Sequence, residues 1–235
     1  MNISQQLKNQ IYFVIPAYNE AKVIANVLKD LKHHGFSNLV VTDDGSTDNT
    51  AEKVNSVKGV TLLPHVINRG QGAAIRTGIG YALQQPDCKY IVTFDSDGQH
   101  RISDLPNMIT LLEQGKCDIV LGSRFLKKAT EKLVPLKKRI LLKGAIFVTY
   151  LVSNIRLTDT HNGYRVMNKK AARKIEIRMD GFEHASEIID EVARKKIPFK
   201  EVPVYVDYTS YSRQKGQKVT NAIKIFLKMV FKSHR

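Results

Sequence analysis

Apolar runs and amphipathic segments alternate along the first half of the chain. The apolar runs are short enough to be buried strands, and the segments between them carry apolar side chains at helical spacing. Predicted strands cover residues 11–15, 38–42, 60–63, 90–94 and 118–121, and predicted helices cover residues 21–33, 73–84 and 103–114. Asn49, with Glu52 three residues later, predicts a capping box at the start of one more helix. Strands that alternate with helices predict an α/β fold, with a mostly parallel central sheet and helices on both faces.

Three of the predicted strands are followed directly by polar residues. Parallel strands end at the same edge of a sheet, and open α/β sheets bind ligands at that edge, so these residues predict one shared site. They are Asn19 and Glu20 after the first strand, Asp43 and Asp44 after the second, and Asp95 and Asp97 after the fourth.

The fourth strand leads into Asp95-Ser96-Asp97-Gly98-Gln99. If strand pairing continued to this point, the two carboxylates would lie on the same side of the chain. Two carboxylates and the amide oxygen of Gln99 suit Mg²⁺ or Mn²⁺, which takes its other ligands from water and substrate phosphates. A solvated turn is the alternative that this short motif leaves open by itself.

The charge of the chain is strongly basic and unevenly distributed. The formal net charge is +15; residues 1–123 hold 11 Lys and Arg against 12 Asp and Glu, whereas residues 124–235 hold 26 against 10. Two basic segments with apolar faces, within residues 127–152 and 219–231, suit an anionic membrane surface. A solvated helix face is the plain alternative. No recognised DNA- or RNA-binding motif accompanies the charge, so we expect no nucleic-acid partner.

The remaining features favour a cytoplasmic protein, peripheral on the inner face of the cell membrane. No run approaches the roughly 18–20 apolar residues needed to span a bilayer, and the first ten residues lack the apolar core of a signal peptide. Cys88 and Cys117 have no metal-type spacing and are expected to be reduced. The turn Gly70-Gln71-Gly72 lacks the third glycine of a dinucleotide-binding motif.

Five motifs, in this order, resemble those of family 2 glycosyltransferases and more narrowly of the dolichyl/undecaprenyl-phosphate sugar synthases. The resemblance runs from about residue 11 to residue 216 and implies one GT-A domain over residues 1–216, followed by a basic, membrane-associating amphipathic helix over residues 217–235. The motifs are Ile15-Pro16-Ala17-Tyr18-Asn19-Glu20, Asp43-Asp44-Gly45-Ser46-Thr47-Asp48, Asn68-Arg69-Gly70-Gln71-Gly72, Asp95-Ser96-Asp97-Gly98-Gln99-His100 and Gly122-Ser123-Arg124.

The resemblance also implies roles for individual residues. Asp95, Asp97 and Gln99 match the family's metal ligands, Asp97 and Asp159 are the catalytic candidates, and Arg165 and Glu187 are the acceptor-binding candidates. In the loop where the family has Arg-x-x-Gly-x-Ser-Lys, Arg213 and Gly216 fit but the final Ser-Lys is absent, so the basic role is transferred to Lys215 or Lys218. The nucleotide-sugar-binding candidates are Pro16, Tyr18, Glu20, Asp43, Asp44, Asp95, Ser96, Arg124, Arg213 and Lys215.

The implied activity is an inverting, metal-dependent transfer of a sugar from a UDP- or GDP-sugar to a polyprenyl (undecaprenyl) phosphate. A phosphate acceptor is already ionised near neutral pH, so Asp159 would position the nucleophile or stabilise the anomeric centre rather than act as a strong base. If the acceptor were instead a sugar hydroxyl of a cell-surface polysaccharide, Asp159 would have to be a true base. A non-catalytic membrane-surface binding protein is the alternative from another class. A small membrane-protein partner is a further expectation.

Overall fold

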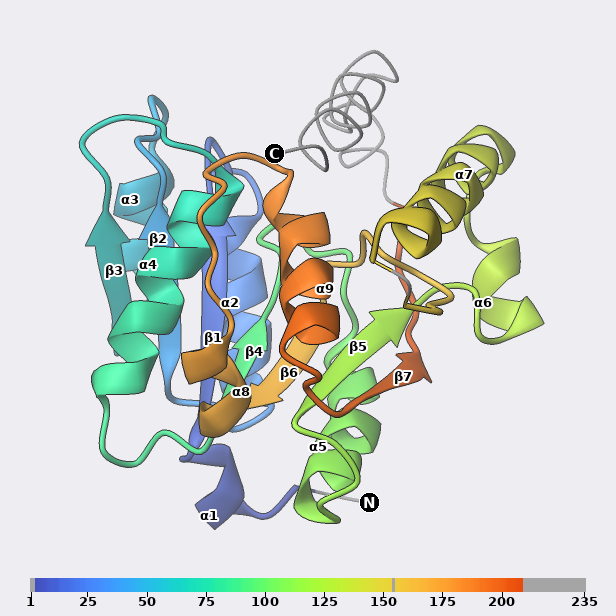
Figure 1. The fold of residues 1–235 in the computed structure, drawn as a ribbon. Helices are drawn as coiled ribbons and strands as arrows, with labels where there is room; N and C mark the ends of the chain where they lie inside the picture. Colours follow the sequence, from blue (N-terminus) through green and yellow to red (C-terminus); the bar gives the residue numbers. More distant parts are fainter. Residues whose placement is uncertain (1–2, 154, 209–235) are drawn as a thin grey trace.

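The structure is a computed structural model that describes residues 3–153 and 155–208 (Figure 1). Seven strands form one sheet, and helices pack on both of its faces. The strands are β1 (Ile11–Ala17), β2 (Leu39–Asp43), β3 (Val60–Pro64), β4 (Tyr90–Thr93), β5 (Ile119–Ser123), β6 (Arg165–Asn168) and β7 (Phe199–Pro203). The helices are α1 (Gln5–Lys8), α2 (Ile24–His33), α3 (Thr50–Asn55), α4 (Gln71–Gln84), the 3₁₀ helix η1 (Ile102–Asp104), α5 (Leu105–Glu113), α6 (Lys128–Lys132), α7 (Leu136–Ser153), α8 (Lys169–Lys174) and α9 (His184–Arg194).

The strand order is β3-β2-β1-β4-β6-β5-β7, and every neighbouring pair is parallel except those that include β6. The predicted α/β fold with a mostly parallel sheet is therefore confirmed. Strand β6 was not predicted, because its four residues follow a polar loop and carry no alternating pattern of their own. Val166 pairs with Val92 on one side and Val120 on the other, so β6 is defined by its neighbours.

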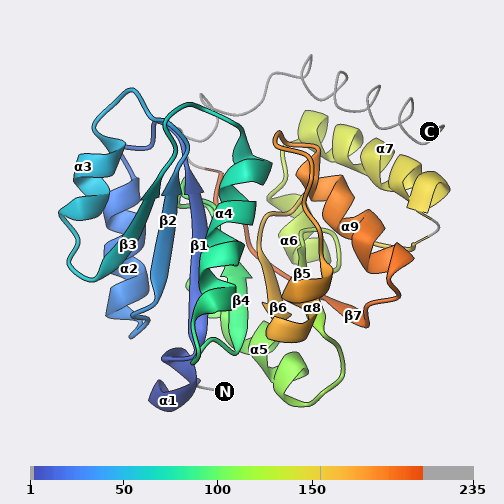
Figure 2. The same cartoon turned by 60° about the vertical axis from the view of Figure 1, so that its left-hand side comes forward.

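Each face of the sheet has its own apolar core, because successive side chains of a strand point to opposite faces. In β1, Phe13 and Ile15 belong to one core and Val14 to the other. The first core also contains residues of α2 and α5, and the second contains residues of α4, α8 and α9. Figure 2 shows α4, α8 and α9 in front of the sheet and α2 and α5 behind it.

One local prediction was wrong, and the condition attached to another is not met. Asn49 precedes α3 but makes no side-chain cap hydrogen bond; instead, Thr50 N donates to Asp48 Oδ1 (3.0 Å). Strand pairing of β4 ends at Thr93, so strand alternation does not orient Asp95 and Asp97. Both residues lie in the turn that follows the strand.

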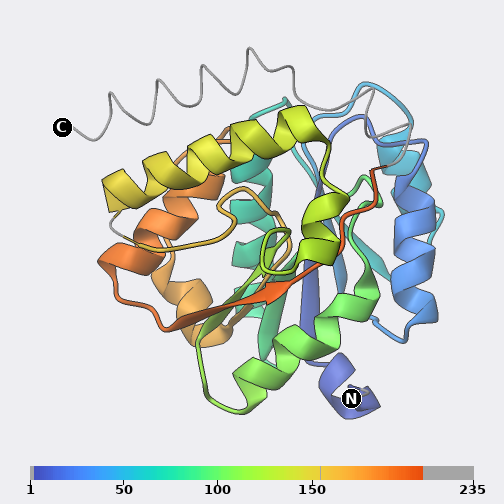
Figure 3. The same ribbon diagram turned by 90° about the vertical axis from the view of Figure 1, so that its right-hand side faces the viewer.

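The basic segment within residues 127–152 forms helices α6 and α7, and α7 packs against α9 (Figure 3). Among the helices within the described residues, none has the length and apolar character that would let it cross a membrane. Arg213, Lys215 and the predicted helix over residues 217–235 lie outside the described part of the chain. Their roles and the domain boundary at residue 216 stay predictions.

Candidate active site

Most of the predicted site residues of the described chain lie after the carboxyl ends of β1, β2, β4 and β5, or in the loop before β6 that packs beside them. This arrangement follows from the parallel pairing of the strands, which brings their carboxyl ends to one edge of the sheet. Asp43 ends β2, the two carboxylates Asp95 and Asp97 follow β4, and Arg124 follows β5 directly. The structure thus brings to one edge of the sheet residues as far apart in the sequence as Tyr18 and Asp159.

Asp95 is held by side chains from two other segments. His100 Nε2 lies 2.9 Å from Asp95 Oδ2, and Gln71 at the start of α4 donates from Nε2 to Asp95 Oδ1 (3.2 Å). Burial by itself would raise the pKa of Asp95, but the hydrogen bond and charge of His100 hold it below its usual range. Asp95 is therefore ionised and fixed in orientation.

The negative charge of Asp97 is less well compensated by its surroundings than that of Asp95. It accepts hydrogen bonds from the backbone N–H (3.0 Å) and the side-chain amide of Gln99, and no cationic side chain forms an ion pair with it in residues 3–153 and 155–208. Burial and the adjacent charge of Asp95 raise the pKa of Asp97 to about 6. Two neighbouring carboxylates, one of them poorly neutralised, are a favourable place for a divalent cation.

The donor set agrees with a cation that is shared with a substrate. Nowhere in the described chain do three or more His, Cys, Asp or Glu side chains converge as a metal-binding group. The two carboxylates, with or without Gln99, would leave most of the coordination shell to water and phosphate oxygens, as Mg²⁺ prefers. Gln99 could add a ligand only through its side-chain amide, whose Nε2 already donates a hydrogen bond to Asp97.

Gly163 lies directly against the carboxylate of Asp95. A Cβ atom at Gly163 would lie 2.6 Å from both Oδ1 and Oδ2 of Asp95, and the Gly163 carbonyl accepts a hydrogen bond from Thr93 Oγ1 (2.6 Å). The backbone of the loop before β6 therefore packs against the carboxylate without room for a side chain. Glycine is required here for close approach rather than for backbone conformation.

Gly163→Ala should therefore displace Asp95 and lower the activity of the site by about tenfold or more, since a misplacement of about 1 Å can cost a hundredfold. Gly80→Ala is the matched control, because Gly80 lies within α4 and a Cβ there would meet nothing within 4 Å. That control should keep full activity and gain about 0.5–1 kcal/mol of stability. Equal activity of the two variants would show that Asp95 needs no fixed position.

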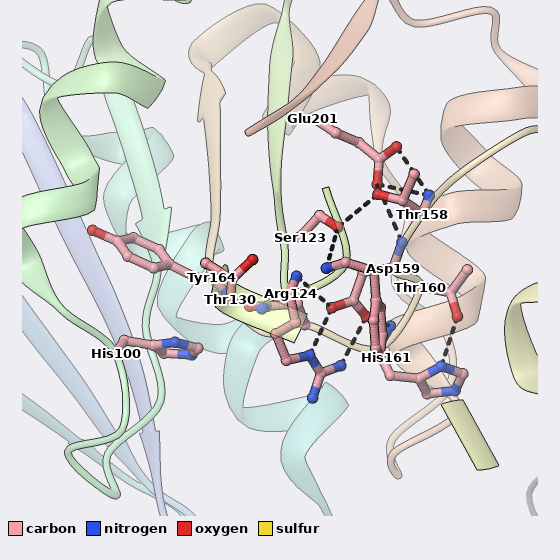
Figure 4. Close-up of polar contacts among 12 residues, drawn as sticks. His100, Ser123, Arg124, Thr130, Thr158, Asp159, Thr160, His161, Tyr164 and Glu201 are labelled. Atoms are coloured by element: carbon pink, nitrogen blue, oxygen red, sulfur yellow. Dashed lines mark hydrogen bonds and ion pairs between the residues drawn. The ribbon is translucent and has the colours of Figure 1, made fainter. Parts of the chain in front are cut away.

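Arg124 and Asp159 form a buried, bidentate ion pair (Figure 4). Arg124 donates from Nε to Oδ2 (2.6 Å), from Nη2 to Oδ1 (2.8 Å) and from its backbone N–H to Oδ2 (3.1 Å). Burial would raise the pKa of Asp159, but Arg124 holds it below its usual range. Burial would likewise lower the pKa of Arg124, and Asp159 reverses the direction. Both groups are therefore charged, and both oxygens of Asp159 are in use.

Glu201 on β7 holds the loop segment that carries Asp159. Its Oε1 accepts hydrogen bonds from Thr158 N (2.9 Å), Thr158 Oγ1 (2.8 Å) and Asp159 N (3.2 Å). Thr158 Oγ1 also lies 2.6 Å from Ser123 Oγ, next to Arg124 (Figure 4). The loop that carries Asp159 is thus fixed to both β5 and β7.

Lys138, which the sequence analysis had placed only within a basic run, is a cation near this site. It lies in the first turn of α7, and its Nζ is 4.9 Å from the centroid of the Tyr208 ring. Desolvation close to the site and the charge of Arg124 lower the pKa of Lys138, although its side chain keeps an exposed surface, while three carboxylates of the site act in the opposite direction. The sequence offered no signal for it, because only the docking of α7 distinguishes Lys138 from its basic neighbours.

Arg165 and Glu187, the predicted acceptor-binding residues, contact backbone groups. Arg165 is buried at the start of β6, and its Nη2 donates to the carbonyl of Ala185 (3.1 Å). Burial lowers its pKa to about 10. Glu187 Oε2 accepts hydrogen bonds from the backbone N–H groups of Arg178 (3.0 Å) and Met179 (2.8 Å). Both side chains thus hold loops in place. Direct binding of the acceptor by either residue stays a prediction.

The acidic pair after β2 also holds loops. Asp44 accepts hydrogen bonds from the backbone N–H groups of Arg69 (3.0 Å) and Gly70 (2.7 Å), and its Oδ1 lies 2.7 Å from His65 Nδ1. Asp43 accepts a hydrogen bond from Ser46 N (3.1 Å). The carboxylates therefore shape the wall of the predicted nucleoside site, and a direct contact with the nucleoside stays a prediction.

The other nucleotide-site candidates differ in exposure. Tyr18 is exposed after β1, where its ring is accessible to a base, whereas Glu20 and Ser96 are buried. Pro16 lies within β1, paired in register with Thr42 of β2. These positions agree with one site along the edge of the sheet, and their contacts with a nucleotide stay predictions.

Comparisons with known proteins identify the class. Residues 12–176 match the family described as glycosyl transferase family 2. An uncharacterised protein of Methanocaldococcus jannaschii is 39% identical over 230 residues, which covers 97% of this chain and 94% of the relative. The UDP-N-acetylglucosamine–dolichyl-phosphate N-acetylglucosaminyltransferase of Methanococcus voltae is 32% identical over 238 residues, 94% of each chain.

A solved structure confirms the predicted GT-A fold. It is the glucosyl-3-phosphoglycerate synthase of Mycobacterium tuberculosis in complex with Mn²⁺, UDP-glucose and phosphoglyceric acid, with a TM-score of 0.64 and 16% identity. The match covers 96% of this chain and 81% of the synthase. The chain belongs to glycosyl transferase family 2. It is thus a glycosyltransferase, as its ordered motifs predicted.

Proposed function

We propose that this protein transfers a sugar, with inversion at the anomeric carbon, from a nucleotide-sugar to a polyprenyl phosphate at a membrane surface. UDP is the favoured nucleotide, because the named relative of Methanococcus voltae uses a UDP-sugar and dolichyl phosphate. The observation that carries the proposal is the poorly neutralised Asp97 beside Asp95 after β4, in a chain similar to a transferase that is named for a UDP-sugar donor.

A divalent cation bound at Asp95 and Asp97 would neutralise the charge that develops on the departing nucleoside diphosphate. The protein's part is to hold that position. His100 and Gln71 fix Asp95, Gly163 leaves space for its carboxylate, and Gln99 orients Asp97. The carboxylates that would hold the cation are therefore positioned before the donor binds, which is the geometry that preorganised catalysis requires.

The Arg124–Asp159 pair supports a phosphate acceptor over a sugar hydroxyl. A general base needs a free oxygen within hydrogen-bond reach of the proton it removes, and both oxygens of Asp159 accept from Arg124. A phosphate monoester needs little base catalysis, because its second pKa is about 6. Asp159 would instead orient Arg124, whose remaining N–H groups, with Lys138 nearby, could bind a phosphate.

Helix α7 supports a membrane location for the reaction. Leu136, Ile140 and Phe147 are exposed and spaced by four and seven residues, so they lie on the same side of the helix. Lys143 lies on the same helix and Lys132 at the end of α6. Apolar side chains accompanied by lysines are typical of helices that lie on an anionic leaflet, where each Lys or Arg contributes about 1 kcal/mol.

The test is a transfer assay with the purified full chain, Mg²⁺ or Mn²⁺, a panel of radiolabelled UDP- and GDP-sugars, and dolichyl or undecaprenyl phosphate. We expect labelled lipid with at least one donor, and complete loss of product with EDTA that is restored by added Mn²⁺. The anomeric configuration of the product tests inversion. Product formed equally in EDTA would contradict the metal site, and transfer only to saccharide hydroxyls would contradict the lipid acceptor.

A further inference from the structure

A second apolar feature lies away from α7, in the connection between β3 and α4. Val66 and Ile67 follow one another at the tip of this loop, and their exposed fractions are 100% and 68%. Phe182, in the loop before α9, is 49% exposed. Single exposed apolar residues are common on soluble proteins, but adjacent ones at a loop tip bury little of their surface within the fold and suit an external contact. Val66, Ile67 and Phe182 are called the apolar tip below.

The two loops that carry the apolar tip are held together. Arg69 Nη2 lies 3.4 Å from Asp180 Oδ2, and Arg76 Nη2 lies 2.7 Å from Asp180 Oδ1. Ala73 N donates to the carbonyl of Asp180 (3.1 Å), and a Cβ at Gly70 would lie 2.4 Å from that same oxygen. Arg69 and Gly70 lie within three positions of Ile67, and Asp180 lies two positions before Phe182, so the two loops belong to one structured surface.

The apolar tip and α7 lie at the same end of the molecule. In Figures 1 and 2 the β3–α4 connection, the loop between α8 and α9, and helix α7 all lie at the upper end of the protein, beyond the carboxyl ends of the strands. The candidate active site lies at that same edge of the sheet. Two elements that carry exposed apolar side chains at the same end of the molecule as the site suit a flat partner better than a small or concave one.

We propose that the apolar tip is a second membrane contact, which acts together with α7 and places the mouth of the active site against the bilayer. The bilayer is favoured as the partner by the apolar side chains themselves and by the arginine residues Arg69 and Arg76 beside them. The ion pairs order both loops in the free protein, so little conformational entropy is lost on docking. This inference rests on the proposed lipid acceptor, because that acceptor gives the site a reason to face a membrane.

The chain contains no tryptophan, so a single introduced tryptophan reports on its own surroundings. Ile67→Trp and Phe182→Trp should show a blue-shifted emission with vesicles that contain anionic lipid, and quenching by brominated acyl chains. Gln84→Trp is the matched control: Gln84 is exposed at the far end of α4, about 20 Å from the tip at 1.5 Å per residue. It should show neither change. Vesicle binding without any response of Trp at position 67 would overturn the proposal, and so would a failure to bind vesicles.

Val66→Ser/Ile67→Ser should weaken vesicle binding by about tenfold, because it removes two apolar side chains from the contact. The same variant should keep its transfer rate with a short-chain, water-soluble polyprenyl phosphate, since it changes only exposed side chains and keeps the backbone of Ile67, which packs against Gly45 of the nucleotide-site motif. Unchanged vesicle binding would overturn the proposal while leaving the proposed function intact. Loss of transfer to the soluble acceptor, or an emission shift of Trp at position 67 that grows with protein concentration alone, would show instead that the tip serves the site or binds a second copy.

Discussion

Asp97→Ala should lower glycosyl transfer by about a thousandfold, equivalent to about 4 kcal/mol of transition-state stabilisation. The physical reason is that the negative charge of Asp97 is poorly compensated, and Gln99 alone could not replace Asp97 in its proposed role as a metal ligand. Transfer is measured with saturating Mn²⁺. Asp30→Ala, at an exposed position on α2, is the control and should be fully active. Full activity of Asp97→Ala would remove the metal assignment.

The same residue makes a prediction about stability. The pKa of Asp97 is raised to about 6 in the folded protein, against about 4 in an unfolded chain, so its ionised form is disfavoured by folding. The metal-free protein should therefore lose stability progressively as pH rises from about 4 through 6, relative to Asp97→Asn. Mn²⁺ should restore that stability at pH 8 but much less at pH 5. Thermal melts of both proteins, with and without Mn²⁺, provide the measurement; identical pH profiles would contradict the raised pKa.

Asp159→Asn should reduce both activity and stability, and this combination separates the two roles considered for Asp159. Removing one partner of a buried ion pair leaves an uncompensated charge and costs about 3–5 kcal/mol. Arg124→Gln should cost a similar amount, because it leaves Asp159 ionised and buried. A free general base would behave differently: its replacement would abolish transfer at nearly unchanged stability, and Arg124 variants would fold normally.

A double-mutant cycle measures the interaction between Arg124 and Asp159 directly. Arg124→Gln/Asp159→Asn removes both charges, so its destabilisation should be well below the sum of the two single variants. Urea unfolding gives the free energies, and transfer assays on the same proteins give the activity. Additive effects on stability would mean that the bidentate contact is not formed in solution. Glu201→Gln is a useful companion, because it weakens the support of the loop without touching either charge.

The candidate metal ligands Asp95 and Asp97 show which features of the site could not be predicted from the sequence. The sequence places Asp95 and Asp97 at the end of a buried strand, but the two residues differ in ways that depend on contacts from far along the chain. Gln71 and Gly163 contact Asp95, and neither is adjacent to it in sequence. The difference in pKa between the two carboxylates is therefore a property of the packing around them rather than of the motif.

The contacts on the proposed acceptor side were even less predictable from the sequence. Arg124 and Asp159 were expected to act separately, on the leaving group and on the acceptor, and the fold pairs them across 35 positions. Lys138 was one of several basic residues until the docking of α7 placed it near the carboxylates. Short-range patterns carry no information on such contacts, because the partners are separated by whole elements.

The sequence by itself determined the α/β class, the positions of the first five strands and the family. It could do so because buried strands and amphipathic helices leave local periodic patterns, and because the motifs follow the strand ends in a fixed order. The tertiary structure decided the insertion of β6 between β4 and β5, the pairing of Arg124 with Asp159, and the grouping of Val66, Ile67 and Phe182 at one end of the molecule. Each of these features depends on contacts between residues far apart in the sequence or on the burial of charged groups. The energies of these interactions are set by neighbouring residues that come together only in the folded chain.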